Sequence, residues 1–302
     1  MVNPTLAASV FIPTRNRADV LRRTLPSILN QSIGSDEYEV IVVDDDSDDD
    51  TADVLASCNH PRLVWWSRRR NSPSGISHGR NEAIDRSRGQ ILLSTDDDCF
   101  LPPNYLRAHL KGHGSCSRRV VTGPIAEISE TPSELRIGAR ARSMGWHTNP
   151  FPGCNGSVSR ALMEEVGRYD TEFDMYGWED LEIYERFRAA GARRKYVGCA
   201  GVLHYKPRVK GDYSGRIRQE IMRGTMGALY HSKHPKFTVA LSTKQHIAYR
   251  LFDWGVDSVF GLGDRVRKVL EDGEEPQSAV MRYLVKSHAE ISGRKFSPLI
   301  VG

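Results

Sequence analysis

An apolar run that ends in three consecutive aspartates constrains the fold of this chain more than any other stretch. The run, Ile91–Asp98, reads ILLSTDDD, and its apolar part predicts a buried strand whose carboxyl end carries the acids. In open α/β sheets, ligands bind at that edge. Adjacent carboxylates repel one another, so a packed fold keeps three of them together where water or a cation offsets their charge. Such oxygen-rich clusters suit Mg²⁺ or Mn²⁺, but the stretch alone fits a solvated acidic turn equally well.

Strands and helices are expected to alternate over the first hundred residues. Short apolar runs predict strands at residues 8–13, 38–43, 63–66 and 91–95. Helices are expected between them, at residues 21–29, 51–56 and 79–87. This alternation predicts an α/β fold with a mostly parallel sheet and right-handed crossovers. The strand at 38–43 also runs into acids, Asp44-Asp45-Asp46, so both acidic clusters are expected at one edge of the sheet.

The composition and the motif content argue against several classes of protein. No G-x-G-x-x-G follows the first strand, which argues against a dinucleotide-binding site. The net charge of +4 is modest and mixed, so nucleic acid is not an expected partner. The five cysteines lack C-x-x-C spacing, which argues against a zinc site or a disulfide framework and favours a reducing, cytoplasmic location. The N-terminus shows no signal-peptide pattern, and no apolar stretch reaches transmembrane length.

Residues 211–302 differ in character from the rest of the chain. Long helical patterns at 217–231, 244–262 and 278–290 predict a helical C-terminal extension that follows an α/β domain over residues 1–210. Within the extension, an apolar stripe flanked by Lys and Arg consists of Ile247, Leu251, Trp254, Val259 and Phe260. The stripe predicts intramolecular core or the face of a homodimer, and alternatively a helix that contacts a membrane only peripherally.

The stretch Gly177-Trp178-Glu179-Asp180 leads into a predicted helix that stops at Gly191. A large aromatic residue beside glycine, followed by paired carboxylates, suits a sugar-stacking platform next to a general base. The two acids also favour the helix dipole, which is the simpler explanation. His204 closes a short apolar run, where a histidine is commonly a satisfied core residue. Beside an oxygen-rich metal site, it could instead supply the single nitrogen ligand.

Five stretches, in their order along the chain, resemble a known family of enzymes. They are Val10–Arg17, Val42–Ser47, Gly79–Ala83 with Gly89, Thr95–Asp98 followed by Pro102, and Asn155–Glu182. Together they are similar to inverting glycosyltransferases of the GT-A fold and family 2 type, and residues 177–182 resemble the galactosyltransferase-like C-terminal motif. The resemblance covers residues 9–204. It implies a GT-A catalytic domain over residues 1–210, with a nucleotide-sugar half at about 1–103 and an acceptor half at about 104–210.

The resemblance also implies roles for individual residues. Those expected to bind the nucleotide sugar are Pro13, Thr14, Arg17, Asp44, Asp45, Arg80, Asp96 and Asp97. Those expected to hold a divalent metal, Mn²⁺ or Mg²⁺, are Asp98, Asp97 and His204. Asp180 matches the catalytic base, with Glu179 beside it. The residues expected to bind the acceptor are Trp178, Gly177 and Asn155.

The sequence departs from the family pattern at both acidic clusters. Three aspartates make the D-x-D motif ambiguous, since Asp96 with Asp98 fits the spacing within the motif. Counting back from Pro102 favours Asp97 as the ligand instead. In the second motif, Asp46 replaces the common glycine and adds charge near the nucleotide.

The resemblance therefore implies a metal-dependent hexosyltransferase. Such an enzyme moves a sugar from a nucleotide-diphosphate donor, here a UDP-sugar, to an acceptor hydroxyl or amine by a single displacement that inverts the anomeric carbon. The acceptor could be a glycan, or a small natural-product or carrier-bound aglycone. Two alternatives stay open. One is a nucleotidyltransferase on a similar scaffold, which the lack of a Gly-rich, Lys-bearing loop after the first strand disfavours; the other is a non-catalytic module that binds nucleotide sugars.

Overall fold

The computed structural model describes residues 6–34, 37–68, 75–137, 149–207 and 212–300. The chain divides into two compact units. The first contains residues 1–172 and 179–208, and the second contains residues 173–178 and 209–302. The short segment 173–178, which immediately precedes Glu179, therefore belongs with the C-terminal residues.

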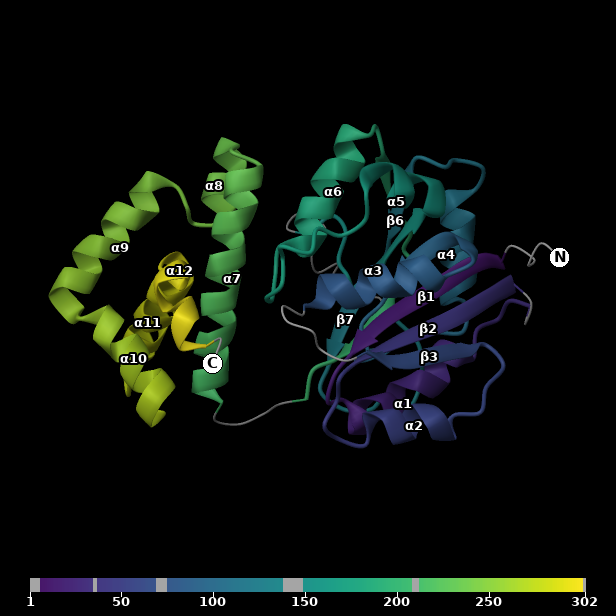
Figure 1. Cartoon of the computed structure of the whole chain (residues 1–302), viewed down its shortest axis with the longest axis horizontal. Helices are drawn as coiled ribbons and strands as arrows, with labels where there is room; N and C mark the ends of the chain where they lie inside the picture. The colour runs from purple at the N-terminus through teal and green to yellow at the C-terminus, as the bar shows by residue number, and fades with distance from the viewer. Residues whose placement is uncertain (1–5, 35–36, 69–74, 138–148, 208–211, 301–302) are drawn as a thin grey trace. The chain divides into compact units, whose positions relative to one another are not determined.

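The first unit is built on a seven-stranded sheet with the order β3-β2-β1-β4-β8-β6-β9 (Figure 1). The strands are β1 (Leu6–Thr14), β2 (Tyr38–Asp45), β3 (Leu63–Arg68), β4 (Gly89–Ser94), β6 (Arg119–Thr122), β8 (Gly156–Ser159) and β9 (Arg193–Tyr196). Neighbouring strands are parallel except β8, which is antiparallel to both β4 and β6. The prediction of an α/β fold with a mostly parallel sheet is confirmed.

A smaller sheet has the strand order β5-β10-β7. Its strands are β5 (Cys99–Phe100), β7 (Ile125–Ile128) and β10 (Val202–Tyr205). β10 is antiparallel to β5, and His204 lies opposite Cys99. Because Cys99 directly follows the three aspartates, this pairing brings His204 to the acidic cluster.

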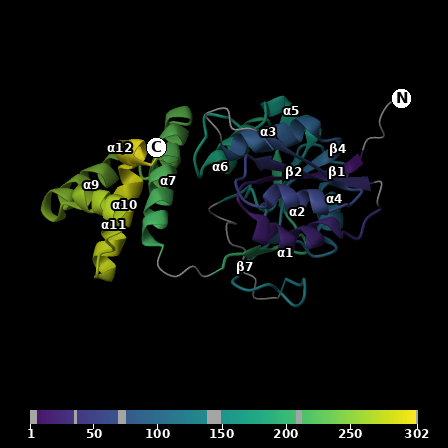
Figure 2. The ribbon, with the colours of Figure 1, turned by 60° about the horizontal axis from the view of Figure 1, so that its bottom comes forward.

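Helices cover both faces of the large sheet (Figure 2). One face carries α1 (Ala18–Leu29), α2 (Thr51–Ser57) and α4 (Tyr105–His113), and the other carries α3 (Ile76–Arg86), α5 (Arg160–Val166) and α6 (Glu179–Ala189). Side chains alternate along a strand, so Val10 and Ile12 pack in the first core while Phe11 packs in the second. Burial on both faces explains why the central strands read as nearly continuous apolar runs.

The carboxyl ends of β2, β1 and β4 meet at one edge of the large sheet. In the parallel register, Thr14 lies opposite Asp44, and Phe11 lies opposite Ser94, the last residue of β4. Asp44 and Asp45 therefore emerge at the same edge as the aspartates that follow Ser94. The expected juxtaposition of the two acidic clusters is confirmed.

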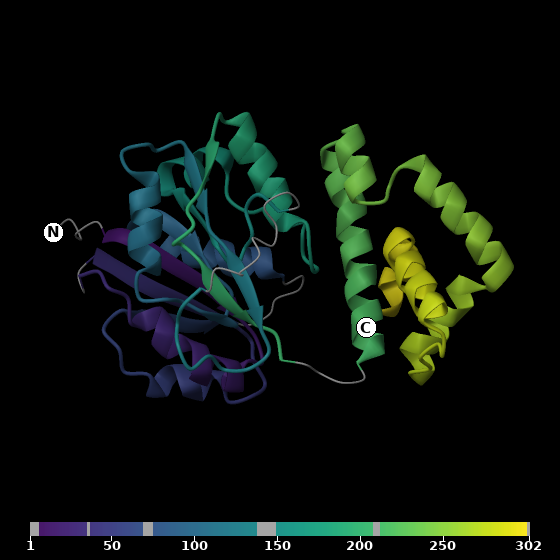
Figure 3. The same ribbon diagram turned by 180° about the vertical axis from the view of Figure 1, so that it is seen from behind.

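The second unit is helical beyond residue 212, as predicted. Its helices are α7 (Tyr213–Lys233), α8 (Phe237–Ser242), α9 (Ile247–Phe260), α10 (Leu262–Asp272), α11 (Ala279–Ile291) and α12 (Gly293–Phe296), with a 3₁₀ turn at Ser297–Leu299. α11 and α12 lie between α7 and α9 (Figure 3). α9 is shorter than the predicted helix at 244–262, because Gly261 adopts a left-handed φ of 59° that ends it. Among the described residues, no helix combines the length and the apolar character needed to cross a membrane.

A core of its own holds the second unit together. Ile217 and Ile221 of α7 pack with Val266 of α10 and Val285 of α11. The backbones of α7 and α11 approach closely at Gly224, where an added Cβ would lie 1.8 Å from the carbonyl oxygen of Glu290. Only glycine permits this approach.

Candidate active site

The end of β1 and the acidic cluster after β4 form one side of the site. Thr14 Oγ1 donates a hydrogen bond of 2.7 Å to Asp97 Oδ2, and Arg17 Nε lies 3.8 Å from Asp97 Oδ1. Thr24 Oγ1 donates to the main-chain oxygen of Asp97 at 2.6 Å. Burial raises the pKa of Asp97 to about 7, while Arg17 and Thr14 oppose that rise. The structure thus brings together Thr14, Arg17 and Asp97, which the sequence predicted to share a nucleotide-sugar site.

The acids at the end of β2 are tied to neighbouring side chains. Asp44 is buried and accepts hydrogen bonds from Ser47 Oγ and, at 2.7 Å, from Ser67 Oγ. Asp45 forms an ion pair of 2.6 Å with Arg68, the last residue of β3. Burial raises the pKa of Asp45, and Arg68 opposes the shift. Asp44 therefore shapes the loop after β2, whereas Asp45 and Arg68 form a charged pair at the sheet edge.

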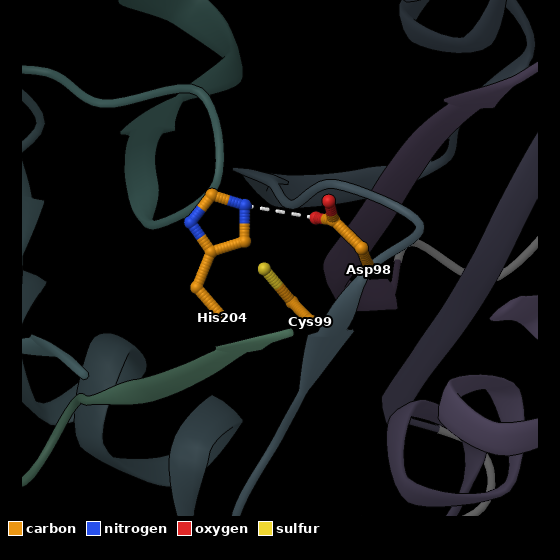
Figure 4. A group of neighbouring side chains, drawn as sticks. All are labelled: Asp98, Cys99 and His204. Atoms are coloured by element: carbon orange, nitrogen blue, oxygen red, sulfur yellow. Dashed lines mark ion pairs between the residues drawn. The ribbon is translucent and has the colours of Figure 1, made fainter. Parts of the chain in front are cut away.

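Asp98 lies beside His204 and Lys206. Its Oδ1 is 2.9 Å from His204 Nε2 (Figure 4), and its Oδ2 is 2.8 Å from Lys206 Nζ. Burial would raise the pKa of Asp98, but the contacts with His204 and Lys206 outweigh it and lower that pKa to about 2. The carboxylate is therefore ionised at neutral pH. Of the two aspartates expected to bind a metal with His204, Asp98 faces the imidazole, whereas Asp97 faces Thr14.

The donor atoms around Asp98 fit a divalent cation. Asp98 Oδ1 and His204 Nε2 are buried, and although they are 2.9 Å apart, neither has a well-directed hydrogen bond. A carboxylate oxygen and an imidazole nitrogen suit Mn²⁺. Cys99 Sγ lies within 4.8 Å of both atoms, but burial raises the pKa of this thiol well above its usual value. Thiolates favour softer metals than Mn²⁺ or Mg²⁺, so the ligands that this cluster offers to those two ions are Asp98 and His204.

A buried arginine joins three carboxylates of the site. Arg80 on α3 has only 2% of its side chain exposed, and its Nη1 lies 3.0 Å from both Glu179 Oε1 and Asp180 Oδ1. Its Nη2 lies 3.6 Å from Asp96 Oδ1. The guanidinium also lies 5.1 Å from the centroid of the Tyr169 ring. Arg80 thus connects the aspartates after β4 with the two acids that begin α6.

Asp180 combines a fixed position with a pKa near neutrality. Its Oδ2 accepts a hydrogen bond of 2.7 Å from the backbone N–H of Gly153, and its Oδ1 accepts one of 3.0 Å from Arg80. Burial raises the pKa of Asp180 to about 7; Arg80 opposes the rise, and Glu179 and Asp96 add to it. A carboxyl group with such a pKa can accept a proton at neutral pH, which suits a general base.

The two residues before Glu179 adopt left-handed backbone conformations, with φ of 101° at Gly177 and 75° at Trp178. The Trp178 indole packs within the second unit, stacked on Tyr230 with ring centroids 5.7 Å apart. Its Nε1 donates a hydrogen bond of 2.8 Å to the carbonyl of Arg223. Only 9% of Trp178 is exposed. Trp178 therefore has a structural role in the second unit. The acceptor-binding role of Gly177 and Trp178 stays a prediction.

Asn155 belongs to a buried polar network. Its Nδ2 donates to the carbonyls of Pro124 and Ala200 at 3.1 and 3.0 Å, and its Oδ1 lies 3.0 Å from His109 Nε2. His109 Nδ1 lies in turn 2.7 Å from Ser157 Oγ. Burial lowers the pKa of His109 to about 3. These contacts use the polar atoms of the Asn155 side chain, so its expected contact with an acceptor also stays a prediction.

Three groups of the site were not predicted from the sequence: Arg68, Lys206 and the backbone N–H of Gly153. Arg68 lies opposite Asp45 in the register of β2 with β3, so the strand order could have indicated it. Lys206 follows His204 by two residues, and alternation along an extended chain places such residues on one side. The N–H of Gly153 leaves no side-chain signal. Pro13, expected at the nucleotide, lies inside β1.

Comparison with known proteins places this chain among glycosyltransferases. The profile of the family described as glycosyl transferase family 2 matches residues 9–166, more than half of the chain. An uncharacterized glycosyltransferase of Bacillus subtilis, YfnE, is 36% identical over 118 residues, which are 39% of this chain and 30% of YfnE. Validoxylamine A glucosyltransferase of Streptomyces hygroscopicus is 26% identical over 217 residues, 61% of this chain and 51% of that enzyme. The match thus spans about half or less of each relative's length.

A solved structure shares the fold. The mannosyltransferase PcManGT of Pyrobaculum calidifontis, in complex with GDP-Man and Mn²⁺, matches 96% of this chain and 88% of its own chain, with a TM-score of 0.59 and 17% identity. At this identity the likeness establishes the fold alone. The residues that the family profile matches include the acidic residues at the edge of the large sheet. The chain belongs to glycosyl transferase family 2 and has the GT-A fold.

Proposed function

We propose that this glycosyltransferase moves a sugar from a UDP-sugar to a hydroxyl or amine of its acceptor, with inversion at the anomeric carbon. The observation that carries the proposal is the network in which Arg80 joins Asp96 to Asp180. This network connects the acidic edge, which suits a metal and a diphosphate, with a carboxylate that suits a base. A single displacement needs one such base and forms no covalent intermediate.

Residues at the ends of β1 and β2 suit the nucleotide. Thr14 and Arg17 carry donors for phosphate or ribose oxygens, and they already hold the carboxylate of Asp97. Asp45, paired with Arg68, can accept a hydrogen bond from a base N–H or a ribose hydroxyl. The mannosyltransferase of similar fold binds GDP-Man, so guanine is the alternative base.

Asp98 and His204 would hold the divalent cation, Mn²⁺ or Mg²⁺. A bound cation would neutralise the charge that develops on the diphosphate as it leaves. The Mn²⁺ in the mannosyltransferase structure supports the use of a divalent cation. Lys206 Nζ lies 2.8 Å from Asp98 Oδ2, and its side chain is 49% exposed, so it can also reach a phosphate oxygen.

Asp180 would accept the acceptor's proton as the acceptor oxygen or nitrogen attacks the anomeric carbon. Gly153 and Arg80 fix the orientation of its carboxylate, and its pKa of about 7 leaves a large fraction ionised at neutral pH. Glu179, whose Oε1 shares the Arg80 guanidinium, keeps a second negative charge beside the base. That charge favours proton uptake by Asp180.

Substitution Asp180→Asn tests the base. We expect the rate of UDP release from a UDP-sugar and its acceptor to fall by about 10²–10⁴, because general-base catalysis contributes that much. UDP binding in the presence of Mn²⁺, measured by calorimetry, should stay nearly unchanged. Glu185→Gln is the matched control, since Glu185 lies on the same helix and pairs with Arg188. Full transfer by Asp180→Asn would contradict the assignment.

A thermal-shift screen of nucleotide sugars, with and without Mn²⁺, tests the donor. We expect UDP-sugars to stabilise the protein and Mn²⁺ to increase the effect, because ligands of the native state raise its unfolding temperature. If GDP-sugars alone stabilised the protein, the nucleotide base of the donor would be guanine instead of uracil. If no nucleoside diphosphate stabilised the chain, the proposed function would be wrong.

A further inference from the structure

Helix α9 turns its acidic residues inward and its large apolar side chains outward. Asp253 is buried and contacts His288 Nδ1 at 3.0 and 2.9 Å. Asp257 accepts a hydrogen bond of 2.8 Å from the backbone N–H of Gly263. By contrast, Trp254 is 71% exposed. A helix packed on one side of a soluble protein normally shows the opposite pattern.

The exposed apolar residues of α9 form one continuous face. At 100° per residue, its members fall within roughly 160° of the helix circumference. They are Ile247, Leu251, Phe252, Trp254 and Val259. Each is at least 60% exposed, and the residues between them on the wheel are alanine, glycine and serine. This uncharged α9 face indicates an interaction site.

Basic residues border the α9 face. Arg250 is exposed and lies one helical turn before Trp254. At the N-terminal end, Lys236 precedes Phe237, whose ring packs on the His246 cap of α9 with centroids 5.3 Å apart. At 100° per residue, Arg250 lies roughly 40° from Trp254 around the helix and so borders the α9 face.

Charges of both signs lie beyond the C-terminal end of α9. There Asp264, Glu274 and Glu275 line a cavity of about 620 Å³ together with Arg265 and Lys268. Over the whole C-terminal region, residues 209–302 carry 15 Lys and Arg against 10 Asp and Glu. Residues 1–208 carry 27 against 28. The excess of positive charge is therefore confined to the part of the chain that contains the α9 face.

The charge at the border of the α9 face distinguishes between two possible partners, a second copy of the chain and a membrane surface. In a two-fold dimer, each copy would bring its own Arg250 to the border of the same apolar contact, so the two copies would add like charges there. Anionic lipid headgroups complement Arg250 and the net positive charge of residues 209–302, and Trp and Phe side chains suit the boundary between headgroups and acyl chains. With 14 residues, α9 is too short to span a bilayer, so it would lie in the plane of the surface. We propose that the α9 face binds the surface of membranes that contain anionic lipids.

Vesicle flotation of the full chain tests the proposal. We expect the chain to float with vesicles of phosphatidylcholine and phosphatidylglycerol, weakly with phosphatidylcholine alone, and less at raised salt. The variant Leu251→Glu/Trp254→Glu should bind at least about tenfold more weakly, because it places two charges in the apolar contact. The matched control is Val280→Glu/Tyr283→Glu, since these residues of α11 are each 69% exposed. Circular dichroism and thermal unfolding check that both variants fold.

Two results would overturn the proposal, and neither bears on the sugar-transfer reaction. The first is flotation of the Leu251→Glu/Trp254→Glu variant equal to that of the control. The second concerns the oligomeric state, measured by light scattering. If the chain is a dimer that does not float with vesicles, and if only the α9 substitutions make it monomeric, then the α9 face binds a second copy of the chain.

Discussion

Replacing Arg80 with methionine should both destabilise the fold and shift the pH dependence of catalysis. The guanidinium is buried and lies 3.0 Å from Glu179 and Asp180, so its removal leaves two carboxylates without their counter-charge. Breaking a buried ion pair in this way costs about 3–5 kcal/mol. Because one of the carboxylates can take up a proton at neutral pH, we expect the low end, about 3 kcal/mol, which corresponds to a fall of roughly 6–12 °C in melting temperature.

The kinetic effect of Arg80→Met follows from the sign of its charge. Arg80 holds down the pKa of Asp180, which burial raises to about 7, so its loss must raise that pKa further. The base has to be ionised, and the acid limb of kcat/KM against pH should therefore move to higher pH. At any pH below the new pKa, the ionised fraction of the base, and with it the rate, falls about tenfold for each pH unit.

Arg86→Met is the matched control for Arg80→Met. Arg86 lies on the same helix, its side chain is 55% exposed, and it pairs with Glu82 at 3.1 Å. Such an exposed pair contributes at most about 1 kcal/mol, and its loss should leave the pH profile unchanged. An acid limb that stays in place or moves to lower pH in Arg80→Met would refute the reasoning. So would a loss of stability no larger than that of Arg86→Met.

Three further predictions concern pH, packing and metal. Because burial lowers the pKa of His109 from 6.5 to about 3, the folded chain keeps the neutral imidazole, and the unfolded chain takes up the proton first as the pH falls. The contribution of His109 to the free energy of unfolding should thus be steady above about pH 6.5 and drop by about 1.4 kcal/mol per unit below it. Asp97 and Asp180, whose pKa values burial raises to about 7, act in the opposite direction over this range, so the measurement is the difference in urea unfolding between the parent and His109→Gln. A difference that is equal at pH 7 and pH 5 would be inconsistent with the prediction. Gly224→Ala should cost about 1–3 kcal/mol, since its Cβ would lie 1.8 Å from a carbonyl oxygen. Gly255→Ala, with open space around it, should be neutral or stabilising by up to about 1 kcal/mol, and calorimetric melting compares the two. Asp98→Asn should remove the effect of Mn²⁺ on UDP binding by calorimetry while His109 variants keep it; an unchanged Mn²⁺ dependence would exclude Asp98 as a ligand.

The sheet and its acidic edge could be predicted because their signals are local. β1, β2 and β4 are short apolar runs that are buried on both faces, and parallel neighbours necessarily end at one edge. The acids that follow β2 and β4 therefore had to meet. Thr14 and Asp97 were predicted at this edge and are hydrogen-bonded there.

Local sequence does not predict the partners of the carboxylates, because these contacts depend on pairings that are distant in the sequence, and only the family resemblance implied that Asp98 and His204 lie together. Asp98 faces His204 because β10 pairs with β5 in one register, and a slip of one residue would turn the histidine to the other side. Arg80 meets Asp180 across 100 positions of sequence. A single arginine on a helix carries no pattern that reveals such a contact.

Strained backbone is the other part of the site that local sequence conceals. Three non-glycine residues with positive φ, namely Asn16 (52°), Asp46 (56°) and Trp178 (75°), each adjoin a predicted site residue. Holding a tryptophan there costs about 1–2 kcal/mol, which glycine avoids, whereas asparagine and aspartate adopt this conformation more readily because their short polar side chains form local hydrogen bonds. At Asn16 and Trp178, contacts of the side chain offset the cost. Asn16 Oδ1 accepts a hydrogen bond of 2.8 Å from the N–H of Asp48, and the Trp178 ring stacks on Tyr230. Glycine at position 178 would relieve the strain and lose the stacking. Since a buried tryptophan contributes more than the strain costs, Trp178→Gly should destabilise the chain by about 2–4 kcal/mol in thermal unfolding, and a variant as stable as the parent would show that the strain dominates.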